Sequence, residues 1–231
     1  MQSLPDGYRA LVIGARGAIG GAFVQQLQAD PRCASLAALH RGSTPAIDYA
    51  QEDSIADAAK ALRGDGPFHL VLVATGVLHG PALAPEKRLA DLDAKALATL
   101  LQTNTIGPAL VLRHFASLLD RQRSLLGVLS AKVGSIGDNR LGGWYGYRAS
   151  KAALNMLLKT AAIEMRRTHP GAVLVALHPG TVRSALSQPF RGEEIGREPT
   201  LAAAELLAVL DGLQVDDSGA FVAYSGERLP W

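Results

Sequence analysis

The sequence contains few residues that could cross-link the chain or hold a metal. Its single cysteine, Cys33, excludes an internal disulfide and every metal site built from several cysteines. The six histidines show no ligand spacing such as His-Glu-x-x-His, so we expect no metal centre. A chain of 231 residues is long enough to bury a sizeable core without such cross-links.

Charge of one sign and long apolar runs are also scarce. The formal net charge is only +2, whereas nucleic-acid-binding proteins usually carry a concentrated basic face. No apolar run reaches the roughly 18 residues that a membrane-spanning helix needs, and residues 1–7 do not resemble the start of a signal peptide. We therefore expect one soluble domain over residues 1–231, cytoplasmic, with neither nucleic acid nor membrane as a partner.

Short apolar runs alternate with longer helical patterns along the chain. Several runs are apolar at consecutive positions, which is typical of parallel strands covered by helices on both faces. The alternation predicts an α/β fold with a doubly wound parallel sheet of about seven strands. Strands are expected at 9–13, 36–40, 47–48, 68–75, 125–130, 173–178 and 220–224. Helices are expected at 19–28, 54–62, 92–119, 148–168 and 200–213, with ligand-binding loops near 76–90 and 179–199.

A glycine-rich turn stands between the first predicted strand and the first predicted helix. It reads Gly14-Ala15-Arg16-Gly17-Ala18-Ile19-Gly20. Glycines let a backbone turn tightly and approach a pyrophosphate, and the following helix offers free N–H groups. The same glycines also fit an ordinary turn, but the strand–turn–helix context favours dinucleotide binding by Gly14, Arg16, Gly17, Ala18, Ile19 and Gly20.

The end of the second predicted strand bears on which dinucleotide binds. NAD sites usually place a carboxylate there for the ribose 2′-hydroxyl, whereas a 2′-phosphate calls for a cation. Here the strand ends in Leu39-His40-Arg41-Gly42, without a carboxylate. Arg41 and Arg16 could converge on one phosphate, or both could be solvated loop residues. We favour NADP(H) over NAD(H).

Tyr147 and Lys151 are four residues apart, so they share one face of the predicted helix. A nearby ammonium favours the phenolate and lowers the pKa of a phenol, which would make Tyr147 a usable acid or base nearer neutral pH. Tyr145 has Ala149 at the same offset and lacks such a partner. A chance pair on an amphipathic helix is the alternative.

Together these segments resemble the short-chain dehydrogenase/reductase family, and the resemblance spans essentially the whole chain. It is carried by the glycine turn, Asn104, the region 130–135, the Tyr147–Lys151 pair and His178-Pro179-Gly180-Thr181-Val182. Residues 134–151 and 224–231 are similar to the C-factor/Sniffer-like carbonyl reductase branch. The resemblance implies a Rossmann-type fold and an NADPH-dependent oxidoreductase acting on a small-molecule carbonyl substrate, an aldehyde or a ketone.

The resemblance also implies roles for individual residues. Tyr147 would protonate the carbonyl oxygen, Lys151 would hold the nicotinamide ribose and depress the tyrosine pKa, and Asn104 would anchor a proton-relay water. Pro108 lies four residues after Asn104 and has no N–H, so within a continuous helix the Asn104 carbonyl would be free for that water. A simple kink at Gly107-Pro108 is equally compatible with the sequence.

Two residues are candidates for the catalytic serine. In most of the family it is the second residue of a Ser-Ser pair, but this chain has Ser130-Ala131. Ser135 lies twelve residues before Tyr147, close to the family's usual separation. Both serines also fit turns that bond their own backbone, and spacing slightly favours Ser135.

Further cofactor-binding residues are expected from their places in the family pattern. Asp48 resembles the residue near the adenine, although a turn aspartate is as good a reading. The other positions follow the third long strand and the Pro-Gly pair: Ala74, Thr75, Gly76, Pro179, Gly180, Val182 and Ser184.

The helices at 92–119 and 148–168 are apolar on more than one face, whereas a helix that covers a sheet needs one apolar stripe. The excess predicts a homodimer or a homotetramer. Four residues could make the substrate pocket apolar or simply pack the core: Leu78, Trp144, Leu186 and Phe190. The alternative function is a dinucleotide-binding signalling or sensor protein with little turnover, since a signalling role attaches to the C-factor name.

Overall fold

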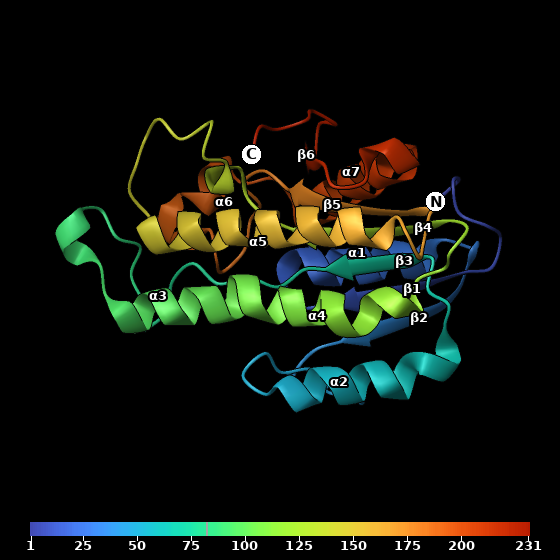
Figure 1. The fold of residues 1–231 in the computed structure, drawn as a ribbon. Helices are drawn as coiled ribbons and strands as arrows, with labels where there is room; N and C mark the ends of the chain where they lie inside the picture. The colour runs from blue at the N-terminus through green and yellow to red at the C-terminus, as the bar shows by residue number, and fades with distance from the viewer. Residues whose placement is uncertain (82) are drawn as a thin grey trace.

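The computed structural model describes residues 1–81 and 83–231 and shows a parallel sheet between two layers of helices (Figure 1). Six strands form the sheet in the order β2-β1-β3-β4-β5-β6, and each pairing of neighbours is parallel. The strands are β1 (Tyr8–Ile13), β2 (Cys33–Leu39), β3 (Leu70–Val73), β4 (Ser124–Leu129), β5 (Ala172–His178) and β6 (Phe221–Ala223). The chain order reverses between β1 and β3, and ligands bind at such switch points in open α/β sheets. The predicted doubly wound α/β fold is confirmed.

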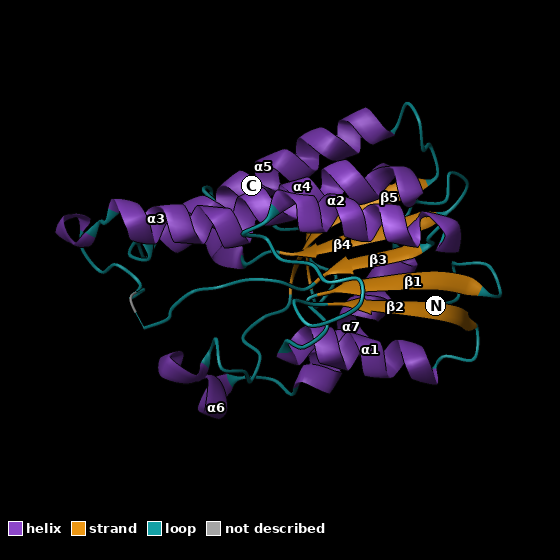
Figure 2. Ribbon diagram, turned by 90° about the horizontal axis from the view of Figure 1, so that it is seen from below, coloured by secondary structure: helices purple, strands orange, loops and turns teal. Residues whose placement is uncertain are grey.

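Each face of the sheet is covered by its own helices (Figure 2). On one side lie α2 (Glu52–Ala61), α4 (Gly107–Phe115) and α5 (Tyr145–Met165), and on the other lie α1 (Ala18–Ala29) and α7 (Pro199–Gly212). Side chains of a strand point alternately to the two faces, so Leu11 and Ile13 pack with α2 and α4 while Ala10 and Val12 pack with α1 and α7. This double burial explains why the strands are apolar at consecutive positions.

The expected seventh strand at 47–48 is wrong, and this segment is irregular and leads into a turn at 49–50. The backbone N–H of Asp48 bonds to the Ser54 hydroxyl at 2.8 Å, and the Asp48 carboxylate accepts the N–H of Ala50 at 3.0 Å. Local bonds therefore occupy the backbone that a strand would use for pairing. Ile47 is buried in the core without being part of the sheet, which explains the apolar residue at this position.

The helix expected at 92–119 is interrupted. It divides into α3 (Ala94–Leu101), a π-helical turn over Gln102–Ile106 and α4, followed by a 3-10 turn over Ala116–Leu118. The loop expected at 179–199 also contains a short helix, α6 (Gly192–Ile195). No helix in the described part of the chain is long and apolar enough to span a membrane.

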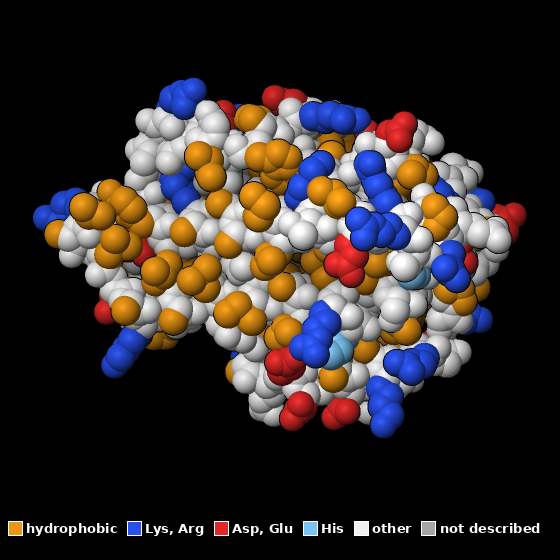
Figure 3. All heavy atoms as spheres, viewed as in Figure 1, with side chains coloured by type: hydrophobic (Ala, Val, Ile, Leu, Met, Phe, Trp, Pro, Cys, Tyr) orange, Lys and Arg blue, Asp and Glu red, His pale blue; other side chains and the backbone are white. Residues whose placement is uncertain are grey.

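The outward faces of the helices carry exposed apolar side chains. Figure 3 shows them along α3, α4 and α5. On α5 they include Met156, which is 67% exposed, and Ile163, which is 56% exposed.

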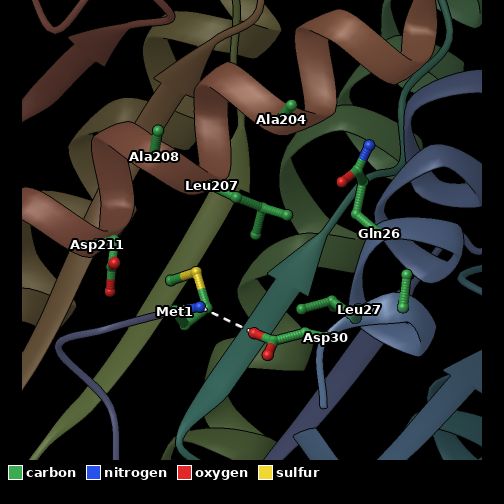
Figure 4. Close-up of a pocket in the computed structure, with 9 residues that line it drawn as sticks. Met1, Gln26, Leu27, Asp30, Ala204, Leu207, Ala208 and Asp211 are labelled. Atoms are coloured by element: carbon green, nitrogen blue, oxygen red, sulfur yellow. Dashed lines mark hydrogen bonds and ion pairs between the residues drawn. The ribbon is translucent and has the colours of Figure 1, made fainter. Parts of the chain in front are cut away.

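A separate groove of about 330 Å³ lies between α1 and α7 (Figure 4). Its lining includes Asp30 and Asp211, which lie at the ends of these helices, and the amino group of Met1 pairs with Asp30 at 2.8 Å. These are the C-terminal ends of α1 and α7, which lie at the edge of the sheet where the parallel strands begin. None of the predicted site residues lines this groove.

Candidate active site

The predicted site residues follow the carboxyl ends of strands β1 to β5 or lie on the helices beside them. Parallel strands bring these ends to one edge of the sheet. The segments after the strands run from 14 to 20, 40 to 49, 74 to 86, 130 to 147 and 179 to 190.

The glycine turn is tightly packed against the end of β3. Gly14 has φ +88°, a conformation that favours glycine, and a Cβ there would lie 2.7 Å from the carbonyl oxygen of Ala74. Gly20 is equally constrained, because a Cβ there would overlap the carbonyl oxygen of Gly14. The turn therefore needs glycine at both positions.

The N-terminus of α1 is open to a ligand. Its N-cap, Gly17, provides no side-chain cap, and the first turn contains no acidic residue. The bond from the Gly21 N–H to the Gly17 carbonyl at 2.7 Å begins the helical ladder. The N–H groups of Ala18, Ile19 and Gly20 precede that bond, as at any helix start, and can bind an anion.

Arg16 and Arg41 are both exposed beside the ends of β1 and β2. Arg16 Nη1 lies 3.5 Å from the position that a Cβ would take on Gly42, the residue after Arg41. Within the described residues, neither guanidinium makes an ion pair. The Arg16 guanidinium thus lies beside the residue that follows Arg41, and both cations are available to an anion.

Tyr147 and Lys151 are both buried in the first turns of α5. Lys151 Nζ lies 5.9 Å from the centroid of the Tyr147 ring and donates a hydrogen bond to the Leu129 carbonyl at 2.9 Å. Burial lowers the pKa of Lys151 to about 8 and raises the pKa of Tyr147 to about 12. The expected lowering of the tyrosine pKa is therefore wrong for the protein alone, because desolvation of the phenolate outweighs the ammonium.

Asn104 is fully buried and clamps the segment after β3. Its side chain accepts the N–H of Val77 and donates to the Val77 carbonyl, both at 2.8 Å. At the neighbouring Gly76, a Cβ would lie 3.5 Å from Asn104 Oδ1 and 3.6 Å from Lys151 Nζ. The fold thus brings Asn104, Gly76 and Lys151 together.

The backbone of Asn104 lies in the π-helical turn Gln102–Ile106. The N–H of Gly107 bonds to the Gln102 carbonyl, one residue farther back than in an α-helix. Pro108 has no N–H to offer the Asn104 carbonyl four residues earlier. The backbone hydrogen bonds around Asn104 therefore follow a π-helical pattern, which differs from a simple kink in an α-helix.

The two candidate serines are both buried but differ in their bonds. The Ser130 hydroxyl donates to Oδ1 of Asn155 at 2.7 Å. The Ser135 hydroxyl accepts the N–H of Asp138 at 3.1 Å, and its own proton has no acceptor among the described residues. The turn before Ser135 packs on α5, since a Cβ on Gly134 would lie 2.8 Å from the Cβ of Lys151.

Tyr49 lies at the same edge of the sheet, although no sequence pattern predicted it there. Its hydroxyl accepts a hydrogen bond from Thr75 at 3.1 Å, and its ring packs so closely on Gly107 that a Cβ there would overlap it. Asp48, one residue earlier, uses one carboxylate oxygen in its own turn. An aromatic residue at the end of an apolar turn was the only sequence signal for Tyr49.

The segment after Pro179 is shaped by Tyr224 and Arg197. Gly180 has φ +73°, and a Cβ there would lie 2.8 Å from the Tyr224 ring. The Arg197 N–H donates to the Thr181 carbonyl at 2.9 Å, and its guanidinium lies 3.8 Å from the centroid of the Tyr224 ring.

Ser184 and Val182 belong to the same segment. The Ser184 hydroxyl donates to the Val182 carbonyl at 3.2 Å. Nothing in the sequence pointed to the bracing of this segment by Arg197, which depends on a contact between distant parts of the chain.

The four residues predicted for the substrate pocket lie around Tyr147 and form one apolar cluster with it and with Leu83 and Leu100. They are Leu78, Trp144, Leu186 and Phe190. The Trp144 and Phe190 rings meet at 4.9 Å, and the Trp144 and Tyr147 rings at 6.2 Å. The loops after β3 and β5 are joined there by a 3.0 Å contact between His79 Nε2 and the Ala185 carbonyl.

Comparison with known families gives the class of protein. A family model described as enoyl-(acyl carrier protein) reductase matches residues 13–224. The chain belongs to the short-chain dehydrogenase/reductase family of oxidoreductases, as the sequence motifs predicted.

The chain is also similar to individual named proteins. The chain is 31% identical over 198 residues to 1-hydroxy-2-glutathionyl-2-methyl-3-butene dehydrogenase of Rhodococcus sp. (strain AD45), covering 86% of this chain and 84% of that protein. It is 36% identical over 151 residues to the C-signal protein of Myxococcus xanthus, covering 62% and 83%.

Among solved structures, the NADPH-bound carbonyl reductase from chicken fatty liver is 26% identical, with a TM-score of 0.80 and coverage of 99% of this chain and 100% of that one. A carbonyl reductase from Pseudomonas aeruginosa PAO1 in complex with NADP is 26% identical, with a TM-score of 0.74 and coverage of 97% and 100%. Carbonyl reductase Sniffer of D. melanogaster, at 21% identity, a TM-score of 0.81 and coverage of 97% and 99%, shares the fold.

Proposed function

We propose that the protein is an NADPH-dependent carbonyl reductase that acts on aldehydes or ketones, with Tyr147 as the general acid. The observation that carries this proposal is the buried Tyr147 beside Lys151, at the edge where Gly76 and Asn104 also lie. The apolar cluster around Tyr147 suits a substrate that presents a carbonyl on an apolar body.

The residues at this edge fit an NADP cofactor. The glycine turn and the open N-terminus of α1 suit the pyrophosphate, and the neighbouring Arg16 and Arg41 suit a 2′-phosphate. The carbonyl reductases from chicken and Pseudomonas aeruginosa, which hold NADPH and NADP, support the same choice. When bound, NADPH supplies the hydride. The other cofactor-binding residues in this proposal are Gly14, Gly17, Ala18, Ile19, Gly20, Asp48, Ala74, Thr75, Gly76, Pro179, Gly180, Val182 and Ser184.

The pKa values suit reduction. With a pKa of about 12, Tyr147 keeps its proton at neutral pH until a substrate oxygen takes it. Lys151, with a pKa of about 8, is mostly an ammonium at pH 7 and stabilises the phenolate that forms. The Asn104 carbonyl, freed by Pro108, would hold the water that returns the proton.

Between the two serines, we propose that Ser135 holds the substrate oxygen. Its hydroxyl proton is free to be donated, whereas the Ser130 proton is already bonded to Asn155. Ser130 instead ties the end of β4 to α5.

The central test replaces Tyr147 by Phe, with Tyr145→Phe as a matched control on the exposed side of the same turn. NADPH oxidation is followed with a panel of aldehydes, ketones and quinones. Tyr147→Phe should lower kcat by about 10² to 10⁴ while leaving NADPH binding intact, since only the proton donor is lost. Wild-type activity in Tyr147→Phe would contradict the proposal.

Cofactor selectivity is tested by Arg16→Ala and Arg41→Ala. Each should weaken NADPH binding by roughly tenfold to a hundredfold and leave NADH binding almost unchanged, because only NADPH carries the 2′-phosphate. Binding is measured by titration of cofactor fluorescence, with Arg63→Ala, an exposed arginine after α2, as the control. Equal affinity of the wild type for NADH and NADPH would contradict the roles of both arginines.

A second candidate function is a dinucleotide-binding signalling protein with little turnover. The 36% identity to the C-signal protein favours it. Binding of NADPH without turnover of any carbonyl in the panel would support this function over the reductase.

We also propose that the apolar outer faces of α4 and α5 meet a second copy of the chain, as a homodimer or a homotetramer. A cytoplasmic location belongs to the same proposal, since the one free cysteine suits a reducing compartment.

A further inference from the structure

A buried carboxylate lies beside the start of α5. Glu86, on the loop after β3, is only 3% exposed. Both of its carboxylate oxygens lie 3.2 Å from the backbone nitrogen of Gly146, and its own carbonyl accepts the N–H of Trp144 at 2.5 Å. Gly146 is the residue immediately before Tyr147.

Glu86 does for α5 what a local capping side chain does for most helices. The first N–H groups of a helix need acceptors, and Ser, Thr, Asp or Asn at the N-cap usually supplies one from an extended backbone. Here the N-cap is Trp144, in a left-handed conformation with φ +53° and with no side-chain cap. A carboxylate from a loop 60 residues away takes that place, at the end of the helix that favours negative charge.

The space around Gly146 is matched to this contact. A Cβ on Gly146 would lie 2.8 Å from Glu86 Oε1 and 2.7 Å from Leu100 Cδ1. Any larger residue would push the carboxylate away from the helix. The glycine is therefore needed for the approach of Glu86 rather than for an unusual backbone angle.

The contact joins the two parts of the proposed substrate pocket. Leu78 and Leu83 lie on the same loop as Glu86, and they pack in one cluster with Trp144 and Tyr147. Glu86 holds Trp144 through its backbone and the first turn of α5 through its side chain. Glu86 thus adds buried hydrogen bonds to the apolar packing that connects this loop with the start of α5.

We propose that Glu86 is a positioning residue, which couples the loop after β3 to the first turn of α5 and holds Tyr147 and Trp144 in place for the substrate. This inference rests on the proposed role of Tyr147 as the general acid. Glu86 contacts neither of the reacting groups and acts through Gly146 and Trp144.

The experiment compares Glu86→Gln, Glu86→Ala and the wild type, with Glu193→Gln on the exposed α6 as the control. Gln keeps an oxygen for the Gly146 N–H, so Glu86→Gln should recover most of the kcat that Glu86→Ala loses. Ala removes the cap, so kcat should fall about tenfold and hydrogen exchange of residues 144–148 should speed up at least as much. The control should match the wild type in every measurement.

Two outcomes would overturn the inference. One is a kcat in Glu86→Gln no higher than in Glu86→Ala, and the other is unchanged kcat and unchanged exchange of residues 144–148 in folded Glu86→Ala. Failure of the proposed function looks different, because Tyr147→Phe would then keep its activity. The exchange measurement needs no turnover and reports on the Glu86 contact in either case.

Discussion

At the residue scale, burial rather than pairing sets the proton affinities at the site. Tyr147, Lys151 and His178 all have desolvation as the largest cause of their altered pKa values. Each is thereby held in its neutral form more strongly than in water, since a buried charge loses its hydration. The Tyr147–Lys151 spacing predicted that the two side chains are neighbours, but the depth of burial decided the direction of the tyrosine shift.

His178 makes this effect measurable as a pH dependence of stability. Burial lowers the pKa of His178 to about 4, and Nδ1 accepts the N–H of Lys132 at 3.3 Å. The unfolded chain binds this proton near pH 6.5, whereas the native protein binds it only near pH 4. Stability should therefore be highest above pH 6.5 and fall by about 3 kcal/mol as the pH drops to 4.

The measurement is urea unfolding at several pH values between 7 and 4. His178→Gln should remove most of the decline, whereas His40→Gln, at the end of β2, should keep it. A decline of full size in His178→Gln would assign the pH dependence to other groups.

At the element scale, the periodic apolar patterns predicted where helices and strands lie, but they did not predict where a helix is interrupted. The apolar pattern over 92–119 is nearly continuous, so the sequence predicted one helix there. The structure divides it at the π-helical turn Gln102–Ile106, where Tyr49 packs on Gly107 and Asn104 clamps Val77. Those partners lie about 25 to 60 residues away along the chain, so the periodicity of the local sequence does not reveal them.

Pro108 links this interruption to the proposed proton relay. Pro108→Ala restores an N–H that can bond to the Asn104 carbonyl and compete with the relay water. We expect kcat to fall about tenfold with an unchanged dissociation constant for NADPH, and the unfolding free energy to rise by about 1 kcal/mol. Steady-state kinetics, cofactor titration and urea unfolding measure these three quantities.

Pro199→Ala is the matched control for this prediction. Pro199 is the first residue of α7, where an N–H has no helical acceptor, so its replacement should leave kcat unchanged. An unchanged kcat in Pro108→Ala would exclude a role for the free Asn104 carbonyl.

At the scale of the whole molecule, the outer face of α5 bears on assembly. Met156 and Ile163 are seven residues apart, so they lie on one side of the helix, and both are exposed. The double variant Met156→Glu/Ile163→Glu should be a monomer by light scattering, while the wild type is a dimer or a tetramer at micromolar concentration. Buried carboxylates at such an interface would cost more than the apolar contact contributes.

Leu201→Glu tests whether the effect is specific to this face. Leu201 is 51% exposed on α7, on the other side of the sheet, and its replacement should leave the assembly intact. A monomeric wild type would rule out the proposed homo-oligomer.

The sequence by itself determined the fold class and predicted the place of the proposed site. Consecutive apolar runs, the glycine turn and the Tyr147–Lys151 spacing are local patterns, and a local pattern is enough to predict a buried strand, a phosphate-binding turn or a shared helix face.

Only the tertiary structure decided the contacts that cross the chain: six strands instead of seven, the raised tyrosine pKa, the bond that occupies Ser130, and Glu86 at the start of α5. Each depends on burial or on a partner far away in sequence. Burial and distant partners are properties of the packed molecule, because they arise only when separate elements meet at one edge of the sheet.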